Sequence, residues 1–193
     1  HLLVEGVLEG FGTPAYTAVD GLPWWNENTV ISDSDPERAM KMMEEGGWTL
    51  GSDGVMEKGQ LRAEFTLLYP SSDVTRQSLA LAVADMVKTA GIQIHVEGKS
   101  WDDLYRAMHS NAVLFGWGSH DPLEMYNLHA SGMKGIEYYN PGYYENPTVD
   151  AWMDKALKAR TEEEANEYWK NAQWDGETGL SALGDAPWAW LVN

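Results

Sequence analysis

The clearest hydrophobic pattern in the chain belongs to a helix near its middle. Over about residues 74–90, apolar side chains recur at three- and four-residue steps, and Gly91 follows as a helix terminator. One face of this helix is therefore expected to lie against a core. The residues of the stripe are Leu79, Val83, Met86, Val87 and Ala90.

Strand patterns lie on both sides of this helix. Residues 61–69 alternate and become continuously apolar at their end, and residues 92–96 alternate between apolar and polar. Ser100 then caps a predicted helix over 101–110, and a further strand is predicted over 112–118. The order strand, helix, strand, helix, strand is typical of parallel strands joined by helical crossovers. The sequence therefore predicts an α/β fold with a mixed, partly parallel sheet flanked by helices.

Capping residues predict several helices outside this region, whereas residues 1–33 show little periodicity. An acceptor side chain followed by proline or by an acidic first turn is typical of a helix start. The predicted helix starts lie at Asp35, at Pro122, at Asn146 or Thr148, and at Thr161. A terminal strand is expected over 187–192.

The end of the strand at 112–118 is the predicted ligand site. An apolar run over 112–115 suggests a strand buried on both faces, and ligands of open α/β sheets bind beyond the carboxyl ends of strands. Trp117 lies between two glycines that leave its ring free to face a cleft, although a core position is the alternative. Asp121 precedes Pro122 and alternatively caps a helix. The expected contacts are Trp117, Gly118, Ser119, His120 and Asp121.

Length and composition set the broad class of the protein. With 193 residues the chain is one domain or one large lobe, and no window approaches the roughly 18 apolar residues of a membrane span. The chain starts in mid-pattern at His1 without a methionine, which suggests a mature product or an excised fragment. The absence of cysteine excludes disulfides and thiolate metal sites.

Charge and aromatic content limit the classes of partner that the protein is expected to bind. A formal charge of −17 would repel nucleic acid and anionic membranes. The high content of aromatic residues, 10 Trp and 9 Tyr, suits a cleft that binds a ligand through ring faces.

Ser119, His120 and Asp121 are adjacent and cannot converge as a catalytic triad, and no metalloprotease or phosphate-loop motif is present. We expect neither enzymatic activity nor a cofactor; an acidic secreted hydrolase using paired carboxylates is a remote alternative.

Short segments spread over most of the chain resemble the C-terminal lobe of the extracellular solute-binding protein family 5, the peptide- and nickel-binding receptors of ABC importers. Each segment is weak alone, whereas their order and spacing together are specific. The segments are Gly10–Ala15, Asp35–Ala39, Gly46–Trp48, Ser72–Asp73 with Arg76, Ala90–Ile94, Gly116–Gly118 with Asp121–Pro122, Asn146–Asp150 and Pro187–Trp188.

The resemblance implies that residues 1–193 form one lobe of a type II periplasmic-binding-protein fold from which the N-terminal lobe is absent. It implies a monomeric receptor that captures a small solute, a short peptide above all, by closing two lobes and delivers it to a membrane permease. It also implies a periplasmic or extracellular location, with membrane association through a lost N-terminal anchor or through the permease.

The resemblance also suggests which residues contact the ligand. Peptide-binding relatives place a Trp at this strand end and an Asp shortly after it, which takes the ligand ammonium. Here His120 lies about where that Asp would fall, which raises the alternative of nickel carried as a small-molecule chelate. His129 is a possible second metal ligand, although a surface histidine is the simpler expectation. Further candidate contacts are Ser71, Ser72 and Tyr139.

Overall fold

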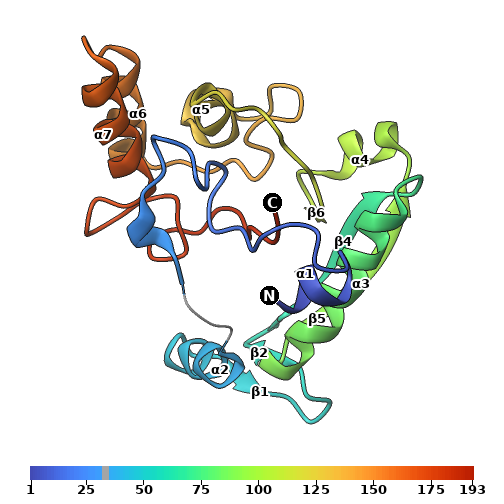
Figure 1. The fold of residues 1–193 in the computed structure, drawn as a ribbon. Helices are drawn as coiled ribbons and strands as arrows, with labels where there is room; N and C mark the ends of the chain where they lie inside the picture. Colours follow the sequence, from blue (N-terminus) through green and yellow to red (C-terminus); the bar gives the residue numbers. More distant parts are fainter. Residues whose placement is uncertain (32–34) are drawn as a thin grey trace. The chain divides into compact units, whose positions relative to one another are not determined.

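A parallel three-stranded sheet confirms the predicted alternation of strands and helices. The central strand β4 (Glu64–Pro70) pairs in parallel with β5 (Gln93–Lys99) on one side and with β6 (Ala112–Val113) on the other. Helix α3 (Val74–Val87) connects β4 to β5, and α4 (Trp101–Ala107) connects β5 to β6 (Figure 1). Parallel neighbours require such crossovers because a tight turn cannot join them.

The computed structural model describes residues 1–31 and 35–193, which divide into two units. The sheet unit contains residues 2–11 and the described part of 32–115, with the parallel sheet at its centre. The helical unit contains His1 and residues 12–31 and 116–193. Across the described residues, no helix is long and apolar enough to cross a membrane.

The strand predicted over 61–69 is divided at Ala63. Its first part, β3 (Leu61–Arg62), closes an antiparallel sheet with β1 (Thr49–Leu50) and β2 (Met56–Lys58). The Ala63 N–H donates to the Met56 carbonyl at 2.8 Å, while the Ala63 carbonyl accepts from Gln93 at 2.9 Å. The chain therefore passes from one sheet to the other at Ala63. The position of this change depends on hydrogen-bond partners that are distant in the sequence.

The strand predicted over 112–118 is shorter and less buried than expected. Regular pairing covers only β6, and one further hydrogen bond runs from the Leu114 N–H to the Leu68 carbonyl at 2.8 Å. Residues 112–115 are half-buried rather than buried on both faces, because β6 is an edge strand with one neighbour. The terminal strand expected over 187–192 is also wrong: only Val192 forms a β-bridge, with Pro14.

Two helices of the sheet unit begin at the predicted caps. The Asp35 side chain accepts from the Arg38 N–H at the start of α2 (Pro36–Glu45), and the Ser100 hydroxyl accepts from the Asp103 N–H at the start of α4. Asp73 caps α3, which continues into the 3-10 turn η2 (Lys88–Ala90). Helix α1 (Leu2–Gly6) is a single short turn near the N-terminus. These local signals suffice because each cap satisfies backbone donors within its own first turn.

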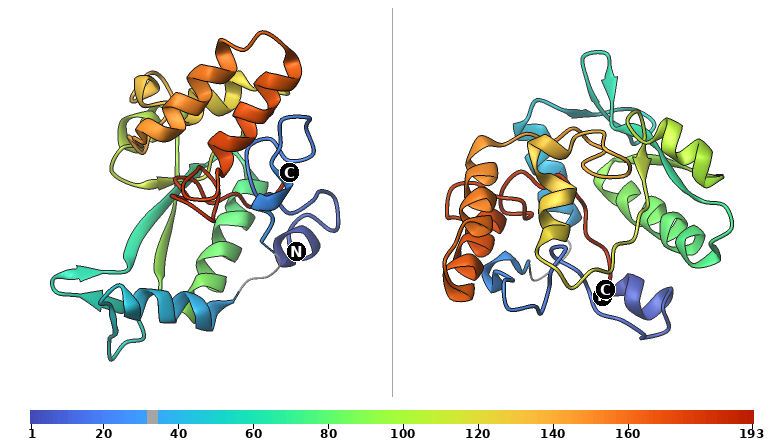
Figure 2. Two further views of the ribbon diagram at one scale, coloured as in Figure 1. Left: turned by 90° about the vertical axis from the view of Figure 1, so that its left-hand side faces the viewer. Right: turned by 90° about the horizontal axis from the view of Figure 1, so that it is seen from above.

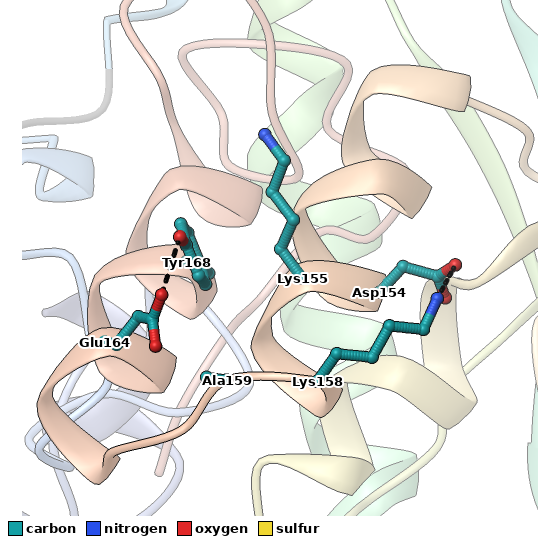
Figure 3. Close-up of a pocket in the computed structure, with 6 residues that line it drawn as sticks. All are labelled: Asp154, Lys155, Lys158, Ala159, Glu164 and Tyr168. Atoms are coloured by element: carbon teal, nitrogen blue, oxygen red, sulfur yellow. Dashed lines mark hydrogen bonds and ion pairs between the residues drawn. The ribbon is translucent and has the colours of Figure 1, made fainter.

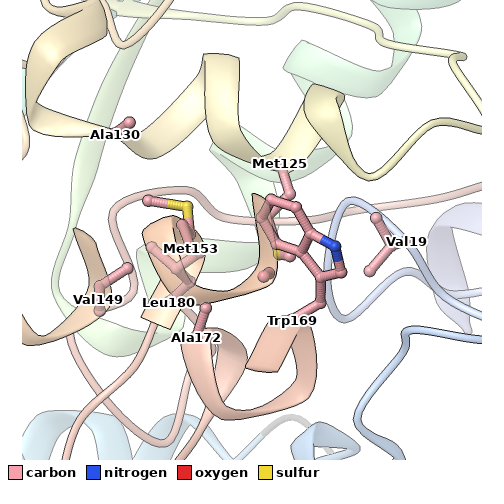
Figure 4. Close-up of a cluster of buried hydrophobic side chains, with 9 residues drawn as sticks. Val19, Met125, Ala130, Val149, Met153, Trp169, Ala172 and Leu180 are labelled. Carbon is pink, nitrogen blue, oxygen red and sulfur yellow. The ribbon is translucent and has the colours of Figure 1, made fainter. Parts of the chain in front are cut away.

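The helical unit is built around an α6–α7 hairpin. Helices α6 (Pro147–Leu157) and α7 (Glu162–Gln173) lie side by side in Figure 2, and the short helix α5 (Leu123–His129) belongs to the same unit. Asn146, not Thr148, caps α6, and Thr161 caps α7 as predicted. Two 3-10 turns complete the unit, η1 (Glu27–Thr29) and η3 (Ser131–Met133). The core shown in Figure 4 consists of Val19, Met125, Ala130, Val149, Met153, Ala156, Trp169, Ala172 and Leu180.

Gly91 is the position of the sheet unit where a side chain is least compatible with the backbone. Its φ is +75°, and an added Cβ would lie 2.7 Å from Cγ of Met56, which is fully buried. We expect Gly91→Ala to lower the free energy of unfolding by about 2–4 kcal/mol, through left-handed strain and overpacking together. Urea unfolding measures this loss.

Gly54→Ala is the matched control for this prediction. Gly54 has a similar φ of +84°, but nothing lies within 4 Å of the position of an added Cβ. This variant should lose only about 1 kcal/mol, which is the cost of the backbone conformation alone. Equal losses in the two variants would show that the contact with Met56 is unimportant.

Candidate functional site

Trp117 and Tyr139, two of the candidate contacts, lie together in the helical unit. Trp117 is half-buried and follows the exposed Gly116, and Gly118 behind it is exposed as well. Its ring centroid lies 6.0 Å from that of Tyr139 at an interplanar angle of 26°, in a stacked arrangement. Trp117 is therefore held by aromatic packing on one side while the backbone next to it is open to solvent.

Two tryptophans from the C-terminal segment extend this aromatic group. Trp188 lies edge-on to Trp117 with centroids 6.4 Å apart, and it stacks on Trp190 at 5.8 Å. All four rings are half-buried. Sequence reasoning missed the two C-terminal rings as site residues. The result is a continuous set of ring edges and faces of the kind that binds apolar or planar ligand groups.

The polar residues after Trp117 are exposed and lead directly into α5. Asp121 Oδ1 accepts from the Leu123 N–H at 2.9 Å, and the Asp121 carbonyl accepts from the Glu124 N–H at 2.9 Å. Asp121 thus accepts two hydrogen bonds from the first residues of α5, although the N-cap of this helix is Pro122, which makes no side-chain capping bond. Ser119 and His120 are both exposed to solvent beside it.

Glu124 is a charged residue of this region that sequence reasoning missed. Burial raises the pKa of its carboxyl group, a hydrogen bond from the Ser119 backbone opposes that shift, and the charge of Asp121 raises the pKa further. Two neighbouring carboxylates disfavour each other's ionised state, and a bound cation would relieve this repulsion. The signal in the sequence was the spacing of Asp121 and Glu124 around the helix start.

His129 is buried in the core, so the expectation of a surface histidine is wrong. Its Nδ1 lies 2.7 Å from the Met125 carbonyl oxygen, and its ring centroid lies 6.3 Å from that of Trp190. Burial lowers the pKa of His129 to about 4, and the hydrogen bond to Met125 opposes this shift only in part. The side chain is therefore neutral at physiological pH and carries its proton on Nδ1.

The described part of the chain contains no preformed metal centre. No group of three or more histidine, aspartate or glutamate side chains within it is arranged to hold a metal ion. A protein-only nickel site at His120 and His129 would lack sufficient ligands.

Ser71 and Ser72 lie in the sheet unit directly after β4 and are exposed. The Ser71 N–H donates to the Lys99 carbonyl at 2.8 Å, which holds the turn beyond the sheet. Because β4 and β6 are parallel, the two serines lie at the same sheet edge as the end of β6. Their contact with a ligand stays a prediction.

A groove of about 260 Å³ lies where α6 meets α7, as Figure 3 shows. Its charged side chains already pair with one another. Asp154 contacts Lys158 at 3.2 Å, and the Tyr168 hydroxyl donates to Glu164 at 3.1 Å. Lys155 places its ammonium 3.8 Å from the centre of the Trp152 ring. This groove therefore offers little unsatisfied chemistry to a ligand.

Residues 1–138 match the family of bacterial extracellular solute-binding proteins, family 5 Middle, and the chain belongs to this family. It is similar to Protein XP55 of Streptomyces lividans, with 37% identity over 160 residues that cover 82% of this chain and 30% of that protein. It is also 26% identical over 165 residues to the oligopeptide-binding protein AppA of Bacillus subtilis, covering 80% of this chain and 30% of AppA. The chain thus spans about a third of the length of these relatives.

A solved structure confirms the fold. NikZ from Campylobacter jejuni, in complex with Ni(L-His), superposes with a TM-score of 0.83 at 24% identity, covering 99% of this chain and 38% of NikZ. The predicted fold class, a mixed α/β lobe of a periplasmic-binding-protein fold, is therefore correct.

Proposed function

We propose that this chain is part of the substrate-binding component of an ABC importer and that its ligand is a short peptide. The observation that carries the proposal is the aromatic group of the helical unit, where Trp117 lies beside Tyr139 and next to the open backbone of Gly118. Rings on a rigid support bind side chains without consuming polar partners. The similarity to AppA, an oligopeptide-binding protein, supports this ligand class. The chain performs no catalysis in this proposal.

Recognition of a peptide ammonium is assigned to the carboxylates after Trp117. Asp121 and Glu124 together carry negative charge at the start of α5, and the pKa of Glu124 is raised partly by Asp121. An ammonium group between them would form charge-assisted hydrogen bonds. Ser119, His120, Ser71 and Ser72 are proposed as further polar contacts.

A nickel chelate is the alternative ligand. NikZ, which has the same fold, was solved with Ni(L-His), and His120 is exposed beside Trp117 in this chain. In such a chelate the small molecule supplies most of the bonds to nickel. This agrees with the described residues, among which no group of three ligating side chains is arranged to hold a metal ion. The imidazole of His120 would supply one further bond to the metal.

The receptor acts as a monomer outside the cytoplasmic membrane, in the periplasm or extracellular space, and delivers its ligand to a membrane permease. A second lobe completes the ligand site, and an N-terminal anchor or the permease keeps the receptor at the membrane. The acidic hydrolase alternative gains no support, because Asp121 Oδ1 accepts from the Leu123 N–H at the start of α5.

Calorimetry on the full-length receptor tests the proposal, with a peptide library and with nickel plus free histidine as ligands. We expect peptides to bind without metal, and Trp117→Ala to weaken binding about 10- to 100-fold, because a large contact surface is lost. Trp152→Ala removes another half-buried tryptophan of the helical unit and should leave affinity unchanged.

The outcomes separate the two ligands. Binding of nickel–histidine but of no peptide, abolished by His120→Ala, would replace the peptide with the chelate. Unchanged affinity in Trp117→Ala for either ligand would remove the strand-end site from the proposal.

A further inference from the structure

A second concave site lies in the helical unit and shares no residue with the strand-end site. The loop after Asp20 and one side of α7 line an open cavity of about 580 Å³. It is lined by residues 21–23 and 25–28 from the loop and by Glu167 and Lys170 from α7. This volume lies in the range of small-molecule sites.

Buried amide side chains hold the two walls of this cavity together. The Asn26 N–H donates to Gln173 Oε1 at 3.1 Å, and the Asn26 amide donates to the Lys170 and Trp174 carbonyls at 3.1 and 3.0 Å. In return, Gln173 Nε2 donates to the Trp24 carbonyl at 2.7 Å. Asn26 and Gln173 are 8% and 0% exposed, so water competes little for these bonds. The cavity walls are therefore preorganised, which reduces the entropy lost when a ligand binds.

The lining of the cavity combines an aromatic ring with excess negative charge. The Trp25 indole N–H donates to the Thr29 hydroxyl at 3.3 Å, which fixes the orientation of the ring. Lys170, the single basic residue of the lining, already contacts Glu167 at 3.4 Å. Within residues 1–31 and 35–193, no basic side chain forms an ion pair with Glu27. One carboxylate of the cavity is thus uncompensated.

We propose that this cavity binds a small organic cation, with an ammonium or guanidinium head on a short aliphatic body. The head pairs with the Glu27 carboxylate, and the Trp25 ring provides a cation–π contact. An anionic ligand would meet the net charge of −17, and a bare metal ion would meet too few ligating groups among the described residues. The site is independent of the importer function proposed above.

Titration of the full-length receptor with agmatine tests this site, at about 0.15 M salt to screen the general field of the acidic surface. We expect saturable 1:1 binding with a Kd of about 1 mM or tighter. Glu27→Gln should raise that Kd about tenfold or more, because the charge partner is lost. N-butylurea, an uncharged analogue of the guanidinium head, should not bind.

Glu177→Gln is the matched control, because Glu177 is an exposed glutamate of the same unit outside the cavity. It should change the Kd less than twofold, by analogy with remote surface charges. Three results would each overturn the proposal: no saturation by about 10 mM agmatine, equal effects of the two glutamine variants, or loss of agmatine binding in Trp117→Ala. The last result would place the cation at the strand-end site.

Discussion

Replacing Trp169 with alanine is expected to lower the free energy of unfolding by about 3–5 kcal/mol, a larger loss than that expected for Gly91→Ala. Trp169 is 3% exposed on α7 and packs among the buried side chains of the helical core (Figure 4). Its removal leaves a void that the neighbouring helix α6 cannot fill without breaking its own contacts. The cost of this void adds to the transfer free energy that is lost when the ring is removed.

Chemical denaturation followed by near-ultraviolet circular dichroism measures this loss. Trp169→Phe keeps much of the ring volume and should lose roughly half as much. Trp152→Ala, at a half-buried position of the same hairpin, should also lose less. A loss below about 1 kcal/mol in Trp169→Ala would mean that the core of this unit is not packed around the ring.

Acid is expected to destabilise the helical unit through His129. Burial lowers the pKa of this histidine to about 4 in the folded state, whereas an unfolded histidine titrates near 6.5. Between pH 6.5 and pH 4 the unfolded state binds a proton at His129 that the folded state does not bind. The free energy of unfolding therefore decreases as the pH falls through this range. Above pH 6.5 both states are neutral and the histidine contributes no pH dependence. The full loss is about 3 kcal/mol by pH 4.

Unfolding free energies measured between pH 7 and pH 4 test this titration. His129→Gln cannot take up the proton, so its stability should fall less steeply than that of the wild type over this window. His109→Gln is the control, because His109 is exposed. Glu124 has the opposite effect on stability. Its pKa is raised in the folded state, so as the pH falls the folded state takes up this proton before the unfolded state does and is stabilised. An identical slope in the wild type and His129→Gln would contradict the role assigned to His129.

Local signals were enough for the helices and for the order of the parallel strands. The stripe that predicted α3 and the caps at Asp35, Ser100 and Thr161 act within a few residues of the chain, so they needed no knowledge of the fold. The strand lengths were less predictable. The break at Ala63 depends on Met56 and Gln93, and the short β6 depends on its edge position.

The burial of polar residues could not be predicted in the same way. Asn140, in the loop over 131–147, is 1% exposed. Its amide donates to the Ala130 and Tyr144 carbonyls and accepts from the Tyr144 N–H at 2.9 Å, which closes the loop over 131–147. A single sequence does not distinguish such a residue from an exposed turn asparagine, because its partners are set by the folded loop.

The sequence alone determined the family of this chain, the strand–helix order and the position of Trp117 beside open backbone, because these depend on local patterns and short motifs. Tertiary structure alone decided which groups surround that tryptophan. It brought Tyr139 and Trp188 against the ring and buried His129. The physical reason is that burial and charge proximity depend on segments far apart in the chain, whereas helical period and capping do not.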